Sequence, residues 1–473
     1  MQTLTARVES SKRIHLVSAP LIAAALAALL TVAFWMMCHR SIVTNAPTWV
    51  DGPVLDILES FRSGRVYQPA GLRMTPYTVL THTPLSYVVD YAFYKFWPGF
   101  AALRLVNILA TLACAGLIFT WVKIRTGTVS AAIFAASAFV LLPPVFKWSQ
   151  TTRSPDAFCC LFSLAALIAL DCYCGRYRDL LVALFVTAAV LSKQTALFVL
   201  CPTLLAATYW KERSLRTALR WSSLAAILLA IFLAAMLGAT HGGFWTNVVD
   251  GNKGCSFSWD QFILVTLRHL CFFWLVVLAA WRFSREARYT TAHFWAIFAI
   301  AFGLASCAKL GSDTMYFFDA SAAVAMLAGL GLHNASPKRC AVLLCSLIPC
   351  LVVFDLRIAK TAGPRVTDGY HAMLTDLEPY PTVLSDEASI AIQMRRPWYW
   401  GDPLVLNALA KQGKWDSTGI EEGIAQQRYA AIVIWNPTVW PLRALDLVQQ
   451  NYIQWRSYPA FKGKYVVYIP KRG

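Results

Sequence analysis

Long runs of apolar residues recur over the first three-quarters of the chain. Most are about 17 to 25 residues long, the length that an α-helix needs to cross a hydrocarbon core of about 30 Å. The pattern predicts about eleven membrane-spanning helices, near residues 17–37, 100–122, 129–146, 155–173, 179–192, 195–210, 219–239, 260–281, 291–307, 316–333 and 339–356. The fifth and sixth runs are short and flank Ser192-Lys193-Gln194, which predicts a hairpin with its turn at a membrane interface.

Two segments outside these runs are too long to be simple connections. Residues 38–98 form a first loop, and residues 357–473 form a tail. Period-two alternation in the tail predicts strands, and helical periodicity predicts helices. The predicted strands are Ala430–Trp435 and Tyr465–Ile469, and the predicted helices are Gly419–Gln427 and Leu442–Gln450. We therefore expect an α-helical polytopic membrane domain over 1–356 and a small soluble α/β domain over 357–473.

The composition excludes an ordinary soluble fold, because 58% of the residues are hydrophobic and only 14% are charged. The first apolar run follows Lys12 and Arg13 but is too long for a signal peptide, so we expect a retained anchor. The net charge of +17 comes largely from every second connection between the runs. This positive-inside pattern predicts a cytoplasmic N-terminus in a plasma or inner membrane, with the first loop and the tail outside. Charge therefore reports topology and implies no nucleic-acid partner.

The first loop contains an ordered set of polar positions that could carry chemistry. Asp51 lies in Trp49-Val50-Asp51-Gly52-Pro53, Tyr67 ends Gly64-Arg65-Val66-Tyr67, and His82 precedes Thr83-Pro84-Leu85. A carboxylate at a membrane surface can act as a general base, bind a metal ion or simply be solvated. Chemistry alone leaves these three interpretations open.

This order of motifs resembles the GT-C superfamily of polytopic glycosyltransferases, especially the bacterial branch grouped with protein mannosyltransferases and the aminoarabinose transferase of lipid A. Asp51 falls on the family's acidic position, Gly64 and Tyr67 on its G-x-x-Y element, and Thr83-Pro84-Leu85 on its Y-P-P-L-like element. The chain departs from the family in two places. The acidic motif has one acid instead of two, and His82-Thr83 replaces Tyr-Pro.

Further positions match the family along the rest of the chain. Arg153-Ser154-Pro155-Asp156 resembles its R-x-D element, although Ser-Pro-Asp is also an ordinary start of a helix. Leu191-Ser192-Lys193-Gln194-Thr195 resembles its S-K-x-T turn, where a lysine binds an anion or snorkels to the interface. Arg104 also occupies a matching position, and snorkelling explains it equally well. The stretch Gly311–Tyr316 resembles a family segment, and Lys309 lies on the same side just before it. Taken singly, Lys309 and Tyr316 are also consistent with solvated loop residues.

The resemblance implies transfer of a sugar from a polyprenyl-phosphate donor to a lipid, polysaccharide or protein acceptor outside the cytoplasm, with inversion. It implies that Asp51 is the general base and that Arg153, Lys193 and Lys309 bind the donor phosphate. Asp156, His82, Tyr67, Tyr316 and Arg104 would support them. The chain has no nucleotide-binding fingerprint and no Cys/His spacing of a metal site, so we expect no nucleotide cofactor. The sequence leaves open whether a divalent metal takes part.

Two other classes of protein have similar sequence patterns. A transporter or a flippase for lipid-linked substrates also has many apolar helices and a basic balance. We see neither the internal repeats nor the ionisable residues at the membrane midplane that transporters tend to show. An assembly subunit that uses the tail for docking is the third possibility.

Overall fold

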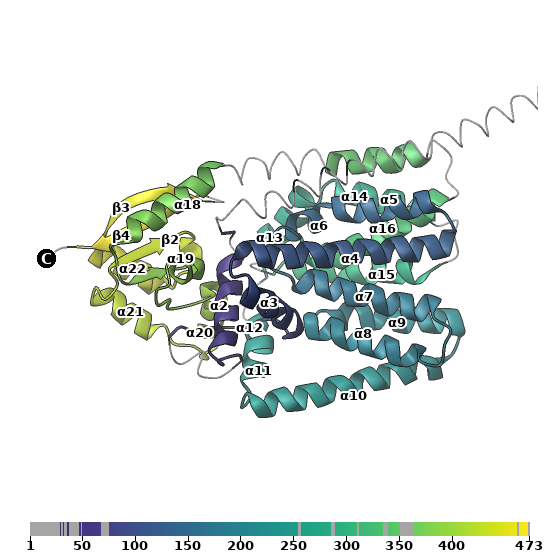
Figure 1. Cartoon of the computed structure of the whole chain (residues 1–473), viewed down its shortest axis with the longest axis horizontal. Helices are drawn as coiled ribbons and strands as arrows, with labels where there is room; N and C mark the ends of the chain where they lie inside the picture. The colour runs from purple at the N-terminus through teal and green to yellow at the C-terminus, as the bar shows by residue number, and fades with distance from the viewer. Residues whose placement is uncertain are drawn as a thin grey trace, which may run out of the picture.

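A computed structural model describes residues 47–48, 50–67, 75–253, 257–284, 289–309, 312–333, 339–350, 364–460 and 463–471, together with positions 29, 32 and 36. A long helical bundle carries a smaller part with a β-sheet at one end (Figure 1). Apart from positions 29, 32 and 36, the predicted first helix lies outside the described residues. The predicted domain boundary at 356/357 also lies outside them and stays a prediction.

The apolar runs of the described bundle form helices at the predicted places. Their bounds are α4 Phe100–Thr126, α5 Val129–Leu141, α6 Pro143–Trp148, α7 Pro155–Cys172, α8 Arg178–Ser192, α9 Ala196–Glu212, α10 Leu215–Ala239, α13 Trp259–Ile263, η3 Leu264–His269, α14 Phe273–Ser284, α15 Thr291–Cys307, η4 Thr314–Phe317 and α16 Phe318–His333. A shorter apolar helix follows at Arg339–Cys350. In the described part, four helices are long and apolar enough to cross a membrane, or five if one bent pair counts as a single span.

Two of the predicted helices are interrupted. The run near 129–146 breaks at Leu142, whose extended backbone separates α5 from α6. Pro143 follows directly, and a residue before proline is disfavoured in the helical conformation. The run near 260–281 bends by 66° between Trp259–His269 and Phe273–Ser284. Hydrophobic length alone therefore predicted where the helices lie but not where they break. The number of about eleven crossings stays a prediction.

Helix α16 occupies the centre of the bundle because it is built largely of small residues. A Cβ added at Gly329 would lie 2.8 Å from the Cβ of Ala135 on α5, so the two helices approach each other closely. Small residues permit this close approach. In lipid, the van der Waals contacts that result stabilise helix packing, because there is no hydrophobic effect between the helices. The apolar windows of α16 and α10 differ sharply in burial, with 78% of the first and 6% of the second buried. Helix α10 therefore presents most of its surface to lipid.

The smaller part contains a four-stranded sheet in the order β1-β2-β4-β3. Strands β1 and β2 are parallel, and the β2-β4 and β3-β4 pairs are antiparallel. The bounds are α18 Pro364–Leu377, β1 Val383–Ser385, α19 Ala388–Gln393, α20 Pro403–Ala410, α21 Thr418–Ala425, β2 Ala431–Ile434, η5 Pro437–Val439, α22 Leu442–Asn451, β3 Tyr452–Pro459 and β4 Lys464–Pro470. The expected α/β character is confirmed, and β2, β4, α21 and α22 match the predicted elements.

The first loop forms two helices at the end of the bundle that faces the sheet (Figure 1). They are α2 Asp51–Arg62 and α3 Leu85–Phe96. At the end of α3, Phe96 and Trp97 are 88% and 50% exposed. Exposed aromatic side chains of this kind are typical of the interface between the bilayer and water. Three short helices, α11 Gly243–Trp245, η2 Thr246–Asp250 and α12 Gly251–Lys253, follow α10 at the same end.

Asp56 on α2 ties the first loop to the smaller part. Its Oδ1 accepts hydrogen bonds from Thr78 Oγ1 at 2.9 Å and from Trp398 Nε1 at 2.6 Å. Beside it, the Tyr77 amide donates to Tyr399 O and the Gly401 amide donates to Tyr77 O, both at 2.9 Å. A buried carboxyl thus sits where three separate segments meet. Burial raises the pKa of Asp56 from 3.8 to about 7, although both side-chain hydrogen bonds oppose the rise.

This raised pKa makes the stability of the junction depend on pH. The folded protein holds a proton on Asp56 at pH values where the unfolded chain has released it, so the contribution is full below about pH 4 and lost as the pH rises through about 7. The free energy of unfolding should fall by on the order of a few kcal/mol over this range. We therefore expect the unfolding temperature in detergent, followed by tryptophan fluorescence, to fall by several degrees.

Asp56→Asn retains the acceptor oxygen without a titrating proton, so its unfolding temperature should fall less steeply with pH than that of the wild type, by the share that Asp56 contributes. The exposed Asp446 on α22 provides the control, because Asp446→Asn should keep the wild-type slope. Equal slopes for wild type and Asp56→Asn would contradict the assignment.

Candidate active site

The residues selected from the sequence gather at the end of the bundle next to the smaller part. Asp51 begins α2 and is fully buried. Its Oδ2 pairs with Arg104 Nη2 on α4 at 2.7 Å and accepts the Thr48 amide at the same distance. Its Oδ1 accepts the hydroxyl of Thr152 at 2.7 Å and the amide of Thr152 at 3.3 Å. Four hydrogen bonds therefore occupy both oxygens of this carboxylate.

The turn at Thr81 and His82 is held by side chains from distant parts of the chain. Gln194 Nε2 and Asn252 Nδ2 both donate to the Thr81 carbonyl, at 2.8 and 2.7 Å. The Tyr67 hydroxyl donates to the carbonyl of His82. Thr83 Oγ1 donates to Val190 O at 2.6 Å, so this turn is bound directly to the α8-α9 hairpin. The G-x-x-Y position thus supports the backbone that carries His82.

The turn before α7 does not use its side chains as a simple helix cap. Ser154 occupies the N-cap position without capping the backbone, and its hydroxyl donates to Asp90 Oδ2 on α3 at 2.6 Å. Asp90 is fully buried, and burial raises its pKa to about 8. Arg153 Nη2 bonds His82 Nε2 at 2.6 Å, and Arg153 Nε lies 4.0 Å from Asp156 Oδ2. The polar side chains of this motif therefore point toward His82 and Asp90 and not toward the backbone of α7.

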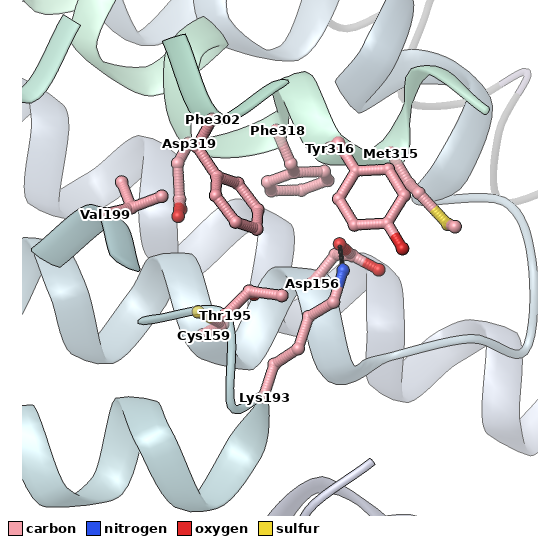
Figure 2. Close-up of a pocket in the computed structure, with 10 residues that line it drawn as sticks. All are labelled: Asp156, Cys159, Lys193, Thr195, Val199, Phe302, Met315, Tyr316, Phe318 and Asp319. Carbon is pink, nitrogen blue, oxygen red and sulfur yellow. Dashed lines mark hydrogen bonds and ion pairs between the residues drawn. The ribbon is translucent and has the colours of Figure 1, made fainter. Parts of the chain in front are cut away.

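Lys193 lies in the turn between α8 and α9 and is buried. Its ammonium forms an ion pair with Asp156 Oδ1 and lies 4.8 Å from the ring centre of Tyr316. Figure 2 shows this ion pair at a small cavity where Lys193, Asp156 and Tyr316 approach one another. A buried lysine among apolar helices requires an anion, because an unpaired charge there is very costly. Snorkelling into water does not describe the observed position of Lys193.

The cavity beside Lys193 has a volume of about 10 Å³, room for about one water molecule. Figure 2 shows that the side chain of Asp319, near the start of α16, also points toward it. Asp319 Oδ1 is buried and has no hydrogen-bond partner among the described residues. The lining residues are Asp156, Cys159, Lys193, Thr195, Val199, Phe302, Met315, Tyr316, Phe318 and Asp319.

His82 stays neutral because it is buried, and nearby cations add to the effect. Burial lowers the pKa of His82 well below its usual value, and Arg153, Lys193 and Lys309 lower it further. A guanidinium can only donate hydrogen bonds, so His82 Nε2 accepts from Arg153. Lys309 donates to Asn252 Oδ1 at 3.2 Å, and this Asn252 also holds the Thr81 carbonyl. Three cations thus converge on one neutral imidazole.

The predicted site residues form one connected region that contains two groups of contacting side chains. The first group is Asp51 with Arg104. The second group is His82, Arg153 and Lys193 with their partners. Sequence reasoning missed Asp90 and Thr152. A carboxylate inside the apolar run of α3 was the available signal for Asp90, because buried acids are rare without a role. For Thr152, the only available signal in the sequence was its position next to Arg153. Among the described residues, no group of three or more His, Cys, Asp or Glu side chains could hold a metal ion.

Comparisons with known proteins agree with this architecture. Residues 85–237 match the family described as dolichyl-phosphate-mannose-protein mannosyltransferase. No protein of curated function matches the chain in sequence. The crystal structure of ArnT from Cupriavidus metallidurans bound to undecaprenyl phosphate superposes with a TM-score of 0.66 at 14% identity, covering 94% of this chain and 97% of that one. The apo state of the same protein gives a TM-score of 0.62 at 15% identity and covers 95% and 98%.

A more distant structure shares part of the same fold. The oligosaccharyltransferase of Archaeoglobus fulgidus, tethered to an acceptor peptide, gives a TM-score of 0.50 at 12% identity and covers 94% of this chain and 74% of its own. The expected resemblance to the GT-C superfamily is confirmed by the family match and these structures. The chain is a polytopic helical membrane protein with the GT-C fold and a small strand-containing C-terminal part.

The ion pair of Lys193 and Asp156 makes a testable contribution to stability. Asp156→Asn leaves a buried ammonium without its closest anion, and we expect the free energy of unfolding to fall by about 3–5 kcal/mol. Adding Lys193→Gln removes the orphaned charge and should recover much of this loss. Thermal unfolding in detergent measures both effects.

The Arg178–Glu212 pair is a suitable control because its side chains are 24% and 23% exposed. We expect Glu212→Gln to cost less than about 1 kcal/mol. A cost of the same small size for Asp156→Asn would show that the Lys193 ammonium does not depend on Asp156.

Proposed function

We propose that this protein is a membrane glycosyltransferase that moves a sugar from a polyprenyl-phosphate donor to an acceptor outside the cytoplasm. The observation that carries the proposal is the convergence of Arg153, Lys193 and Lys309 around His82, at the same end of the bundle as the buried Asp51. Fixed cations in a partly dry site stabilise a departing phosphate more strongly than cations in water. A donor anchored among apolar helices would bring its phosphate to this end.

Arg153 and Lys193 are the proposed ligands of the donor phosphate, with Lys309 as a third. Arg153 is bonded to a neutral imidazole and Lys309 to a neutral amide, so a phosphate can approach either without displacing a closely bound anion. Lys193 differs, because Asp156 already neutralises it. Phosphate binding at Lys193 therefore requires the ammonium to exchange or share its carboxylate. Asp156 would hold Lys193 in the charged state until the donor arrives.

Asp51 is the proposed general base for the acceptor hydroxyl. Among the described residues, Thr152 Oγ1 is the one neutral side-chain donor to this carboxylate, so an acceptor hydroxyl would replace it at Oδ1. Asp51 is fully buried, and access requires α2 or the turn at Thr152 to move. Proton transfer to a carboxylate as the glycosidic bond forms, in a single displacement, gives inversion at the sugar carbon.

We propose that the site faces the periplasm or exterior of a plasma or inner membrane, with the N-terminus in the cytoplasm. The alternation of basic connections supports this orientation. The sugar and the acceptor can be identified by mass spectrometry of envelope glycans and lipids from cells that lack the protein. The acceptor would be a lipid, a polysaccharide or a protein.

The distribution of buried charge favours an enzyme over a transporter. In the described part of the chain, the buried charged residues lie in loops, in the short helices α2, α3, η2 and α21, or near the ends of spanning helices. Transporters instead place ionisable groups near the midplane, where alternating access exposes them to either side. Uptake into proteoliposomes without a covalent product would decide for transport.

Asp51→Asn tests the base assignment. Membranes containing the variant, given radiolabelled polyprenyl-phosphate sugar, should lose about 10²- to 10⁴-fold in transfer while the protein is expressed normally. Donor KM should change little, because the cations around His82 are untouched. Arg153→Ala provides the contrast and should raise donor KM. Normal turnover by Asp51→Asn would remove Asp51 from the catalytic role.

A further inference from the structure

Helix α2 carries Asp51 and also forms a contact with the smaller C-terminal part. Figure 1 shows α2 between α19 and the helical bundle. Asp51 faces Arg104 and Thr152, whereas Gly52 is turned about 100° around the helix axis and faces α19. Any force that the C-terminal part exerts on Gly52 is therefore transmitted to the adjacent Asp51.

The close approach at Gly52 is made by Glu387, which precedes α19. A Cβ added at Gly52 would lie 2.2 Å from Glu387 Oε1 and 3.0 Å from the Ala388 amide nitrogen. Gly52 lies inside a helix without a positive φ, so its backbone does not require glycine. Glycine in a helix costs about 1 kcal/mol relative to alanine. The space that Glu387 occupies accounts for glycine at this position.

The carboxyl of Glu387 is fixed by its own segment. Its Oε1 accepts hydrogen bonds from Ser389 Oγ at 2.5 Å and from the Ser389 amide at 3.3 Å, and its amide donates to Ser385 Oγ at 3.0 Å. The side chain is only 1% exposed. Glu387 is therefore a rigid contact on α2, in contrast to a flexible surface acid.

The groups that face Glu387 are acids and phenols. Asp51 lies on α2, Asp386 precedes it in the chain, Tyr370 lies on α18 and Tyr465 on β4. The Asp51 carboxylate is itself paired with Arg104. Burial, followed by Asp51 and Asp386, raises the pKa of Glu387 well above its usual value. The neutral carboxyl can lie beside Asp51, whereas an ionised one would repel it.

We propose that the C-terminal part positions Asp51 for catalysis through Glu387 seated on Gly52. Glu387 is a positioning residue, because it contacts α2 and not the reacting groups. The catalytic consequence rests on the proposed function, in which Asp51 receives the proton of the acceptor. The contact itself can be tested without transfer activity. A displacement of about 1 Å at a catalytic group can cost about 10²-fold in rate.

The test uses full-length protein in detergent or proteoliposomes. Glu387→Ala should lower kcat for transfer at least about tenfold with donor KM unchanged, and it should speed amide hydrogen exchange in 51–62. Glu387→Gln, a neutral isostere, should keep most of the wild-type kcat. It should also keep its activity as the pH rises, whereas we expect wild-type activity to fall once Glu387 ionises. Gly52→Ala should reproduce the loss of Glu387→Ala by displacing the carboxyl. The control is Glu421→Gln, a buried acid on α21 that pairs with Arg443.

The outcomes separate the two proposals. Faster exchange in 51–62 for Glu387→Ala, in a protein whose wild type transfers no sugar, would support the contact and overturn the glycosyltransferase assignment. Unchanged exchange and unchanged kcat in Glu387→Ala would overturn the positioning role. A kcat loss equal to that of Glu421→Gln, or a pH profile that Glu387→Gln leaves unaltered, would likewise overturn it. If Glu387→Ala does not fold, Glu387→Gln and Gly52→Ala carry the same test.

Discussion

The structure depends on the need to pair every charge that is buried at one end of an apolar bundle. Asp51 with Arg104 and Asp156 with Lys193 are ion pairs removed from water, where a lone charge would be prohibitively unfavourable. Each pair joins segments that are distant in sequence. The first pair fixes the start of α2 to α4, and the second fixes the start of α7 to the α8-α9 hairpin. The hydrogen bond from Thr152 to Asp51 joins the two. The same charges are the groups available for chemistry.

A second consequence is that the described part of the first loop belongs to the same polar region as the bundle. Its backbone at Thr81 is held by Gln194 and Asn252, and its Asp56 contacts Trp398. The loop thus receives hydrogen bonds from the bundle and from the C-terminal part. Such a loop can transmit a change in either part to Asp51.

The turn at Arg153-Ser154-Pro155-Asp156 shows how one motif can serve two roles. Pro155 begins α7 as the sequence predicts, and Ser154 takes the N-cap position. Its hydroxyl, however, bonds Asp90, and Asp156 bonds Lys193. The helix start and the polar cluster are compatible because the backbone provides the first and the side chains provide the second. Local sequence could not distinguish these uses, since the partners lie on α3 and in the hairpin.

Hydrophobic periodicity determined most of the fold, because membrane thickness and helix geometry impose lengths that can be read directly from the chain. The tail pattern likewise located β2, β4 and two helices. Motif order located Asp51, Arg153 and Lys193. Only the tertiary structure decided the bend between η3 and α14, the bonding of Asp90 to Ser154 and the approach of Glu387 to Gly52. These features depend on which segments become neighbours, and residues that are distant in the sequence leave no local pattern when they meet.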